Sequence, residues 1–158
     1  MPESIFKQIA LDILRLHQHT NRSLLAVQHS NSTKIHDTVY ATLNGRYYVM
    51  LPAQQHADSR QSIFLIETEN SDARLSWIAD THHIQQKGTL YRRALAALCN
   101  RMAQTKLPTD CNRNACLVEL VPQQGLFTLG NNQDFVLSPI DLVKALYPAA
   151  SRKEAFTR

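Results

Sequence analysis

The sequence predicts a mainly β chain of the α+β kind, a small antiparallel barrel with peripheral helices. Three observations support this fold class. Strand patterns arrive as hairpins instead of alternating with helices, which disfavours a parallel doubly wound sheet. About seven or eight short strand patterns share a chain of 158 residues that is 44% apolar. Helical periodicity is confined to three segments, at the start, in the middle and near the end of the chain.

The segment from Thr38 to Leu51 carries the clearest local signal. Apolar and polar residues alternate on both sides of Asn44-Gly45. Asn-Gly between two alternating runs is a strong hairpin signal, because a type I′ turn needs positive φ at both central residues. We therefore predict two antiparallel strands here, the second of which ends at Pro52.

The three helices are predicted from periodicity and end signals. Residues 4–18 place apolar side chains on one face, with Ser4 as the expected cap. A second helix is predicted from Leu90 to Gln104. The run Ser138-Pro139-Ile140-Asp141 predicts the start of the third, because it combines a capping residue, a proline at the first helical position and an acid three residues after the cap. This helix is expected to end at about Tyr147.

The remaining strands are predicted from β-forming residues and turn signals. We expect Pro122-Gln123-Gln124-Gly125 to turn a strand at 115–121 back into another at 126–129. Gly130-Asn131-Asn132 is expected to turn that strand into Phe135-Val136-Leu137. Three earlier stretches are also predicted strands: 22–29, Ser62 to Glu67, and Arg74 to Thr81.

Composition bounds the class of protein. The net charge of +4 and the 19% of charged residues are ordinary for one globular domain, which we place at residues 1–150, followed by a charged tail at 151–158. There is no apolar run near the ~20 residues that span a bilayer, and the N-terminus does not read as a signal, so we expect a cytoplasmic protein without a membrane partner. Basic residues are scattered, so nucleic-acid binding is not expected. The four glycines form no phosphate-binding motif.

Histidines and cysteines suggest no metal centre. His17 and His19 flank the end of the first helix, where the helix dipole favours a cation, so we expect a capping role for them instead of a metal site. The neighbours His82-His83 point to opposite faces of a strand, so they do not readily chelate one ion. We expect all three cysteines to be free thiols in a reducing compartment: Cys99, Cys111 and Cys116.

Two groups of residues are candidates for ligand contacts. His56, Ser59 and Arg60 stand in a polar stretch between two strands. This stretch is either a solvated connector or the rim of a pocket in which Arg60 anchors an anionic group. Trp77 and Tyr40 carry large flat rings on strands. They are either core or dimer contacts, or rings that stack against a planar ligand.

Three stretches of sequence carry a resemblance to a known family. Tyr40-Ala41, Tyr47 to Leu51 and His56-Ala57-Asp58-Ser59 together resemble a strand-hairpin-strand unit that ends in an H-[AT]-R-N loop. Arg74-Leu75-Ser76-Trp77 resembles an R-L-[ST] strand. Cys116 to Leu142 resembles a closing segment L-x-x-L-x-P-x-x-G-x-[FY]-x-x-G-F-G-x-A-[FY] … D-L. Over about residues 20–150 the chain is similar to the FMN-binding split barrel, the pyridoxamine 5′-phosphate oxidase-like superfamily, and in particular to its heme-utilisation branch.

The resemblance implies an antiparallel split β-barrel with peripheral helices that forms a homodimer and holds its ligand at the dimer interface. The implied ligand is FMN in the wider superfamily. In the branch it is heme, in some members cleaved oxidatively, with an axial His from the C-terminal segment. The cofactor contacts that we assign on this basis are Tyr40, His56, Ser59, Arg60 and Trp77. Any catalysis would be that of a flavin-dependent oxidoreductase or a heme-degrading oxygenase, in which the cofactor performs the redox reaction and the protein binds and orients it.

The sequence departs from the branch at three places. Ala150-Ser151-Arg152-Lys153 stands where the branch has G-H-R-K, so a serine replaces the axial His. Asp58-Ser59 replaces Arg-Asn, and Gly130-Asn131-Asn132 replaces G-F-G. The first hypothesis is therefore an FMN- or heme-binding split barrel, and the alternative is a degenerate split barrel that serves as a binding or interaction module without a cofactor or catalysis.

Overall fold

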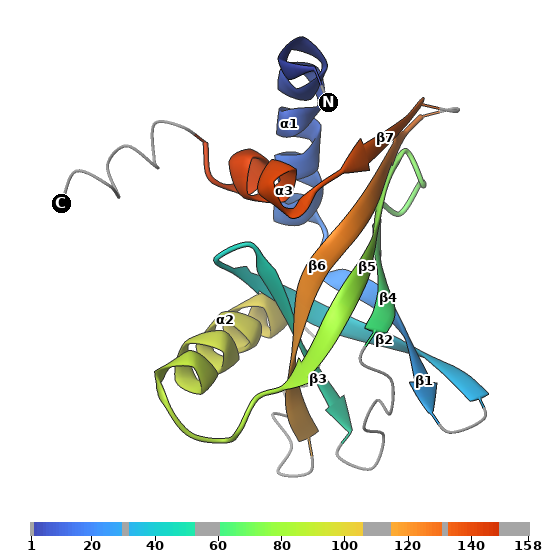
Figure 1. Ribbon diagram of the computed structural model, residues 1–158. Coiled ribbons are helices and arrows are strands. Elements are labelled where there is room, and N and C mark those ends of the chain that lie inside the picture. Colours follow the sequence, from blue (N-terminus) through green and yellow to red (C-terminus); the bar gives the residue numbers. More distant parts are fainter. Residues whose placement is uncertain (1, 30–31, 53–60, 106–114, 131–132, 149–158) are drawn as a thin grey trace, which may run out of the picture.

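The computed structural model describes residues 2–29, 32–52, 61–105, 115–130 and 133–148. These ranges contain seven strands and three helices, which confirms the predicted fold class (Figure 1). In chain order the elements are α1 (Glu3–His19), β1 (Arg22–His29), β2 (Ser32–Leu43), β3 (Arg46–Pro52), β4 (Gln61–Glu67), β5 (Ala73–His83), α2 (Thr89–Thr105), β6 (Ala115–Leu129), β7 (Gln133–Leu137) and α3 (Pro139–Leu146).

All strand pairs are antiparallel, in the order β3-β2-β1-β4-β5-β6-β7. An additional pairing between β3 and β6 closes the first six strands into a barrel. Residues 115–120 of β6 pair with β3, whereas residues 125–129 pair with β7. One long strand therefore closes the barrel with its first half and leaves it with its second half, so that β7 lies outside the barrel (Figure 1).

The predicted hairpin is confirmed. Asn44 and Gly45 have φ values of +53° and +77°, as the type I′ turn requires. A Cβ at Gly45 would lie 2.7 Å from the Val143 side chain of α3, so the turn also packs closely against that helix. The first strand of the hairpin is longer than predicted, because residues 32–37 pair with β1.

The predicted turn at residues 122–125 is wrong, because β6 continues through it as one strand. Pro122 lies opposite Ala79 and Gln124 opposite Ile78, so Gln123 is an extra residue at a bulge in the pairing with β5. A bulge accommodates a proline, which has no N–H for the ladder, and bends the strand without reversing it.

The helices confirm most of the predicted end signals. Ser138 and Asp141 form both bonds of the predicted capping box of α3: the Asp141 N–H donates to the Ser138 hydroxyl oxygen at 3.3 Å, and the Ser138 N–H donates to the Asp141 carboxylate at 2.9 Å. Ser4 is not a cap, because α1 begins one residue earlier and Pro2 occupies the N-cap position. None of the described helices is long and apolar enough to cross a bilayer.

Two apolar cores hold the elements together. The larger one fills the barrel and continues between α1 and α3, which pack against each other and against the strands at the same part of the barrel (Figure 1). The smaller one lies between α2 and the outer surface of β2, β3 and β6, and consists of Ala41, Tyr48, Ala94, Leu98 and Leu117. These two cores leave one outer face of the barrel without a described helix packed on it. This face is formed by β1, β4, β5 and the second half of β6.

Candidate functional site

The uncovered outer face of the sheet is unusually apolar. Directly paired residues on adjacent strands point to the same face, and two neighbouring cross-strand rows follow from the strand register. Of the ten large apolar residues that are exposed in the described ranges, six lie in these two rows. One row is Leu24, Leu65, Ser76, Leu126 and Val136, and the other is Ile35, Ala26, Ile63, Ile78 and Gln124.

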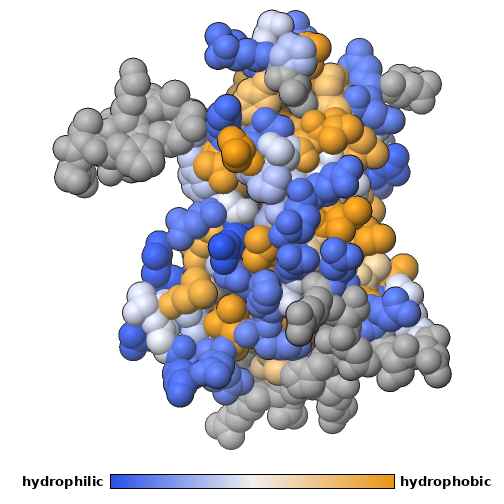
Figure 2. Space-filling model, in the orientation of Figure 1, coloured by the Kyte–Doolittle hydropathy of each residue, from blue (hydrophilic) through white to orange (hydrophobic). Residues whose placement is uncertain are grey.

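Several hollows lie on this face, one of them lined by Arg22, Leu24 and Leu65, and three others adjoin one another. The first, of about 330 Å³, lies over β1 and β4 and extends to Ile63 and Ile78. The second, of about 310 Å³, shares those two residues and reaches Gln124 and Val136. The third, of about 860 Å³, shares the latter pair. Figure 2 shows apolar side chains reaching the surface along the side of the molecule where β5, β6 and β7 run. We call the three joined hollows the outer groove.

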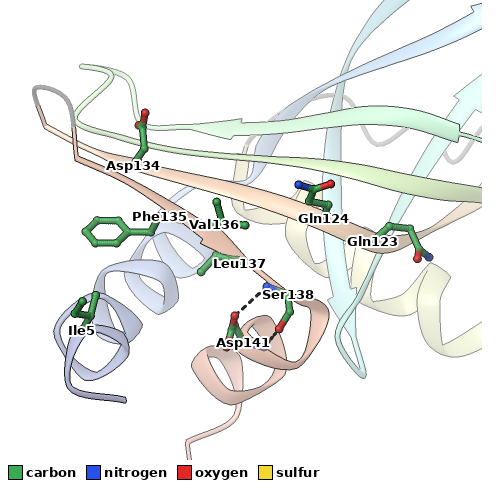
Figure 3. Close-up of a pocket in the computed structure, with 9 residues that line it drawn as sticks. All are labelled: Ile5, Gln123, Gln124, Asp134, Phe135, Val136, Leu137, Ser138 and Asp141. Atoms are coloured by element: carbon green, nitrogen blue, oxygen red, sulfur yellow. Dashed lines mark hydrogen bonds between the residues drawn. The ribbon is translucent and has the colours of Figure 1, made fainter. Parts of the chain in front are cut away.

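The largest hollow wraps around the edge of the sheet at β7. Figure 3 shows Gln124, Asp134 and Val136 on the outer side of the β6–β7 pair, whereas Phe135 and Leu137 lie toward the helices. Ile5 of α1 and the capping box at the start of α3 complete its wall. The two carboxylates at this end, Asp134 and Asp141, disfavour an anionic ligand group here.

The described lining of the outer groove has a defined chemistry. Apolar walls are interrupted by the side-chain amides of Gln28, Gln61, Gln123 and Gln124 and by the hydroxyl of Ser76. Amides donate and accept hydrogen bonds with equal ease. The described lining residues include no His, Cys, Met, Tyr, Lys or Arg, so they offer neither an ordinary axial ligand for iron nor a cation.

Three of the predicted cofactor contacts, His56, Ser59 and Arg60, lie outside the described residues, as do Cys111 and the tail at 151–158. Their roles stay predictions. Arg60 directly precedes Gln61 in the chain, and Gln61 lines the first hollow. The role of Arg60 as an anion anchor stays a prediction, because only its neighbour Gln61 belongs to the described lining.

The other two predicted contacts, Trp77 and Tyr40, have buried side chains with 0% relative exposure. Their position matches the simpler interpretation of the sequence, that these rings are core residues. Trp77 contributes to the floor of the second hollow, but its ring belongs to the interior of the barrel. The stacking role of either ring stays a prediction, and their enclosure does not favour it.

Trp77 is one member of a hydrogen-bonded chain inside the barrel. Its indole N–H donates to the Tyr47 hydroxyl oxygen at 3.0 Å. The Tyr47 hydroxyl and the Nε2 atom of His17 are 2.8 Å apart, and the Nδ1 atom of His17 is 2.7 Å from the Ile13 carbonyl oxygen. Because a carbonyl only accepts, the His17 proton lies on Nδ1, and Nε2 accepts the hydroxyl proton of Tyr47. Every polar side-chain atom of Trp77, Tyr47 and His17 thus has a hydrogen-bond partner.

His17 is buried and does not behave as a cation at the helix end. Burial lowers the pKa of its imidazole to about 4, and the nearby positive charge of Arg101 also lowers the pKa. The dipole interpretation is therefore wrong for His17, which is neutral at pH 7, while His19 is exposed at the last turn. The guanidinium of Arg101 supplies the positive charge at the C-terminal end of α1 instead. It donates hydrogen bonds to the carbonyl oxygens of His17 and Thr20 at 3.1 and 2.8 Å.

A second polar cluster, which the sequence did not reveal, lies on the side of the barrel that α2 covers. The Tyr48 hydroxyl donates to Glu119 at 2.7 Å, and Arg46 donates to the other carboxylate oxygen at 3.2 Å. Burial, followed by the bond to Glu119, raises the pKa of Tyr48. These three residues are neighbours only through the β3–β6 pairing, so their positions in the chain gave no signal.

Histidines and thiols form no candidate metal centre in the described ranges, where no group of three or more potential ligands lies together. His82 and His83 are both exposed at the end of β5. Cys99 and Cys116 are thiols outside any disulfide, as expected.

Tyr40→Phe is expected to leave the free energy of unfolding unchanged or to raise it by up to about 1 kcal/mol. The Tyr40 hydroxyl is buried without a hydrogen-bond partner in the described structure, and Arg101 lies over its ring, 4.8 Å from the centroid. Removing an unsatisfied buried hydroxyl removes a desolvation cost. Urea denaturation of the variant measures the effect. A matched Tyr47→Phe variant, which breaks two bonds, should lose about 1–3 kcal/mol; a similar loss in Tyr40→Phe would show that the Tyr40 hydroxyl has a partner.

Comparison with known proteins supports the fold. No family model matches the sequence, and no curated protein matches it. Among solved structures, a heme-binding protein from Mycobacterium smegmatis superposes with a TM-score of 0.69 at 16% identity, covering 85% of this chain and 59% of its own. This chain thus spans less than two thirds of the length of that protein. HutZ from Vibrio cholerae, described as a heme storage protein, gives a TM-score of 0.61 at 16% identity, with 75% and 92% covered.

A third match is described as a member of the pyridoxinephosphate oxidase family. A Clostridium acetobutylicum protein related to general stress protein 26, of the pyridoxinephosphate oxidase family, gives a TM-score of 0.64 at 6% identity, with 86% of this chain and 98% of its own covered. Heme-binding and oxidase-like proteins therefore share one architecture with this chain. The chain has the split-barrel fold of the pyridoxamine 5′-phosphate oxidase-like superfamily, the fold that the M. smegmatis heme-binding protein and HutZ also adopt.

Proposed function

We propose that the protein is a homodimeric split-barrel protein that binds FMN in the outer groove, where a second copy covers the ligand. The observation that carries the proposal is the outer groove itself, an apolar sheet face lined at intervals by amides and hydroxyls. A flavin has the matching chemistry, because its ring system is flat and largely apolar but carries a polar edge with hydrogen-bond donors and acceptors.

The second copy is proposed from the exposed apolar area. Val136 is 63% exposed, Ile63 56% and Ile35 68%, and all three lie on one continuous face. Contiguous exposed apolar surface of this kind marks an interaction site in a soluble protein. A twofold-symmetric dimer covers such a face with an identical one, so one patch satisfies both subunits.

The orientation of the ligand follows from charge. Asp134 and Asp141 stand at the β7 end of the outer groove, whereas Arg60 adjoins the β4 end in the chain. A phosphate is favoured near a guanidinium and disfavoured near carboxylates. We therefore propose that the FMN phosphate lies away from the β7 end, with Arg60 and Ser59 as its proposed contacts, and that the ring lies over Ile78 and Gln124. The bound flavin would supply redox chemistry, and this chain's residues would bind and orient it.

Heme is the second candidate, and the similarity to heme-binding proteins of the same fold favours it. Its flat apolar ring also suits the outer groove. The described lining residues lack an imidazole, thiol or thioether for the iron, and Ser151 stands where the branch has its axial His. The chemistry of the described lining therefore supports flavin more directly.

Titration with FMN, followed by flavin absorbance and fluorescence, is expected to saturate at one flavin per subunit. Gln124→Leu is expected to weaken binding about tenfold, since it removes one hydrogen bond at the ring, and Arg60→Ala is expected to weaken it by a similar factor. Gln85→Leu changes an exposed glutamine outside the described lining and serves as the control. Saturation by hemin but not by FMN would transfer the proposal to heme, and binding of neither would favour the interaction module.

Val136→Asp is expected to dissociate the dimer. The substitution places a carboxylate at the β7 end of the apolar face of both subunits, so each dimer contains the change twice, and we expect the dissociation constant to rise at least about a hundredfold. Sedimentation equilibrium measures the constant. Leu11→Asp, which charges an exposed apolar residue of α1 away from this face, is the matched control. A wild-type chain that sediments as a monomer would contradict the proposed dimer.

A further inference from the structure

Trp77, Tyr47 and His17 are joined by hydrogen bonds inside the barrel, and Trp77, at one end of this series, lies beneath the outer groove. We propose that this series is a proton-coupled electron donor, which reduces a one-electron oxidant bound in the outer groove. In this proposal Tyr47 loses the electron, His17 accepts the phenolic proton, and Trp77 relays the electron to the oxidant. We take the natural oxidant to be a bound flavin in its photoexcited state. Only this identity of the oxidant rests on the proposed function.

Trp77 is placed for electron transfer to the outer groove. A Cβ built on Gly125 would lie 2.7–2.8 Å from three atoms of the six-membered ring of Trp77. The indole therefore lies directly against the backbone of Gly125, and that backbone also lines the middle hollow of the outer groove. Only the backbone of Gly125 lies between the indole and the hollow. This separation is short enough for electron tunnelling.

Tyr47 is the residue that can give up its proton together with its electron. An oxidised phenol is a strong acid, so tyrosine is oxidised readily only where a base already accepts its hydroxyl proton. The Tyr47 hydroxyl has such a base in His17 Nε2 at 2.8 Å, and it also receives the Trp77 N–H at 3.0 Å. The Tyr40 hydroxyl has no acceptor in the described structure. The Tyr48 hydroxyl donates to Glu119, but it belongs to the other core, away from Trp77.

The step balances as one electron and one proton. The oxidant takes one electron from the Trp77 indole, and the resulting indole radical cation takes one from Tyr47. As Tyr47 loses its electron, its hydroxyl proton moves to His17 Nε2, which leaves a neutral phenoxyl radical and an imidazolium. The oxidant is reduced by one electron. Burial and Arg101 disfavour the imidazolium, so the proton returns to Tyr47 when the radical is reduced.

In a solution of the full chain without a cofactor, a laser flash excites tris(bipyridine)ruthenium(II), and added hexaammineruthenium(III) takes one electron from it to generate tris(bipyridine)ruthenium(III). The two half-exposed tyrosines, Tyr91 and Tyr147, are replaced by Phe in every sample so that only three buried tyrosines remain. Transient absorption and electron paramagnetic resonance then report a tyrosyl radical. Because the oxidant is added from outside, the outcome does not depend on FMN binding. A radical is expected, and its formation is expected to slow in D₂O because a proton moves with the electron.

Variants in the same background locate the radical. The signal is expected to be lost in Tyr47→Phe and in His17→Gln, which keeps the tyrosine but removes the base, and to persist in Tyr40→Phe and Tyr48→Phe. Circular dichroism verifies that each variant folds, and the D₂O measurement needs none of them. No radical in the parent protein, equal rates in H₂O and D₂O, or a signal that survives Tyr47→Phe would each overturn the proposal.

Discussion

Gly125→Ala is expected to destabilise the protein by about 1–3 kcal/mol, the usual cost of overpacking a well-filled core. In a strand, alanine is ordinarily better than glycine by about 0.5–1 kcal/mol, so the sign of the effect is diagnostic. The reason for a loss is the 2.7 Å approach of the new Cβ to the Trp77 ring, which is itself fixed by its bond to Tyr47. Thermal or urea denaturation of the two proteins measures the change.

The same substitution in a Trp77→Phe background provides the control. Phe leaves room over residue 125, so Gly125→Ala should then cost less than about 0.5 kcal/mol or stabilise the strand. A double-mutant cycle isolates the coupling between the two positions. Equal losses in both backgrounds would show that the glycine is required for a reason other than Trp77.

The fold was predictable because its signals are local or follow from resemblance. The Asn44-Gly45 turn and the capping box at Ser138 each depend on residues within four positions of one another. The turn predicted at Pro122 failed for the opposite reason. Whether a proline ends a strand or occupies a bulge depends on the partner strand, and the pairing with Ala79 is not visible in the local sequence.

The candidate site was predictable only in part. The polar stretch before Gln61 was singled out from the sequence, whereas the outer groove was not, because it joins residues from β1, β4, β5, β6 and β7. One signal could have indicated it. Ile63-Phe64-Leu65-Ile66 is apolar at consecutive positions, which is typical of a strand covered on both faces. In the monomer only one face of this strand is covered, and Ile63 is exposed on the other.

The role of His17 could not be read from the chain for the same reason. Its position at the end of a helix suggested a cation, whereas the fold places it against Tyr47 of the barrel, 30 residues away, in a fully enclosed site. Burial then decides its charge, because desolvation outweighs the helix dipole.

Stability is expected to fall by about 3 kcal/mol through His17 as the pH drops from 7 to 4, at about 1.4 kcal/mol for each pH unit in which one proton is taken up. The folded-state pKa of about 4 lies below the ordinary value of 6.5. Between these two values the unfolded chain binds a proton at this residue and the folded chain does not. The contribution is therefore complete above pH 6.5, declines as the pH falls, and is gone near pH 4.

The measurement compares denaturation curves of the wild type and His17→Gln across this range. Gln keeps an oxygen that can accept from Tyr47 but does not titrate, so the changes that come from all other groups are common to both proteins. The variant has its own difference in free energy of unfolding from the wild type at pH 7. On acidification to pH 4, this difference should change by about 3 kcal/mol in favour of the variant. A difference that stays constant with pH would mean that His17 takes up its proton equally in both states, and therefore that the imidazole is not held neutral between Ile13 and Tyr47.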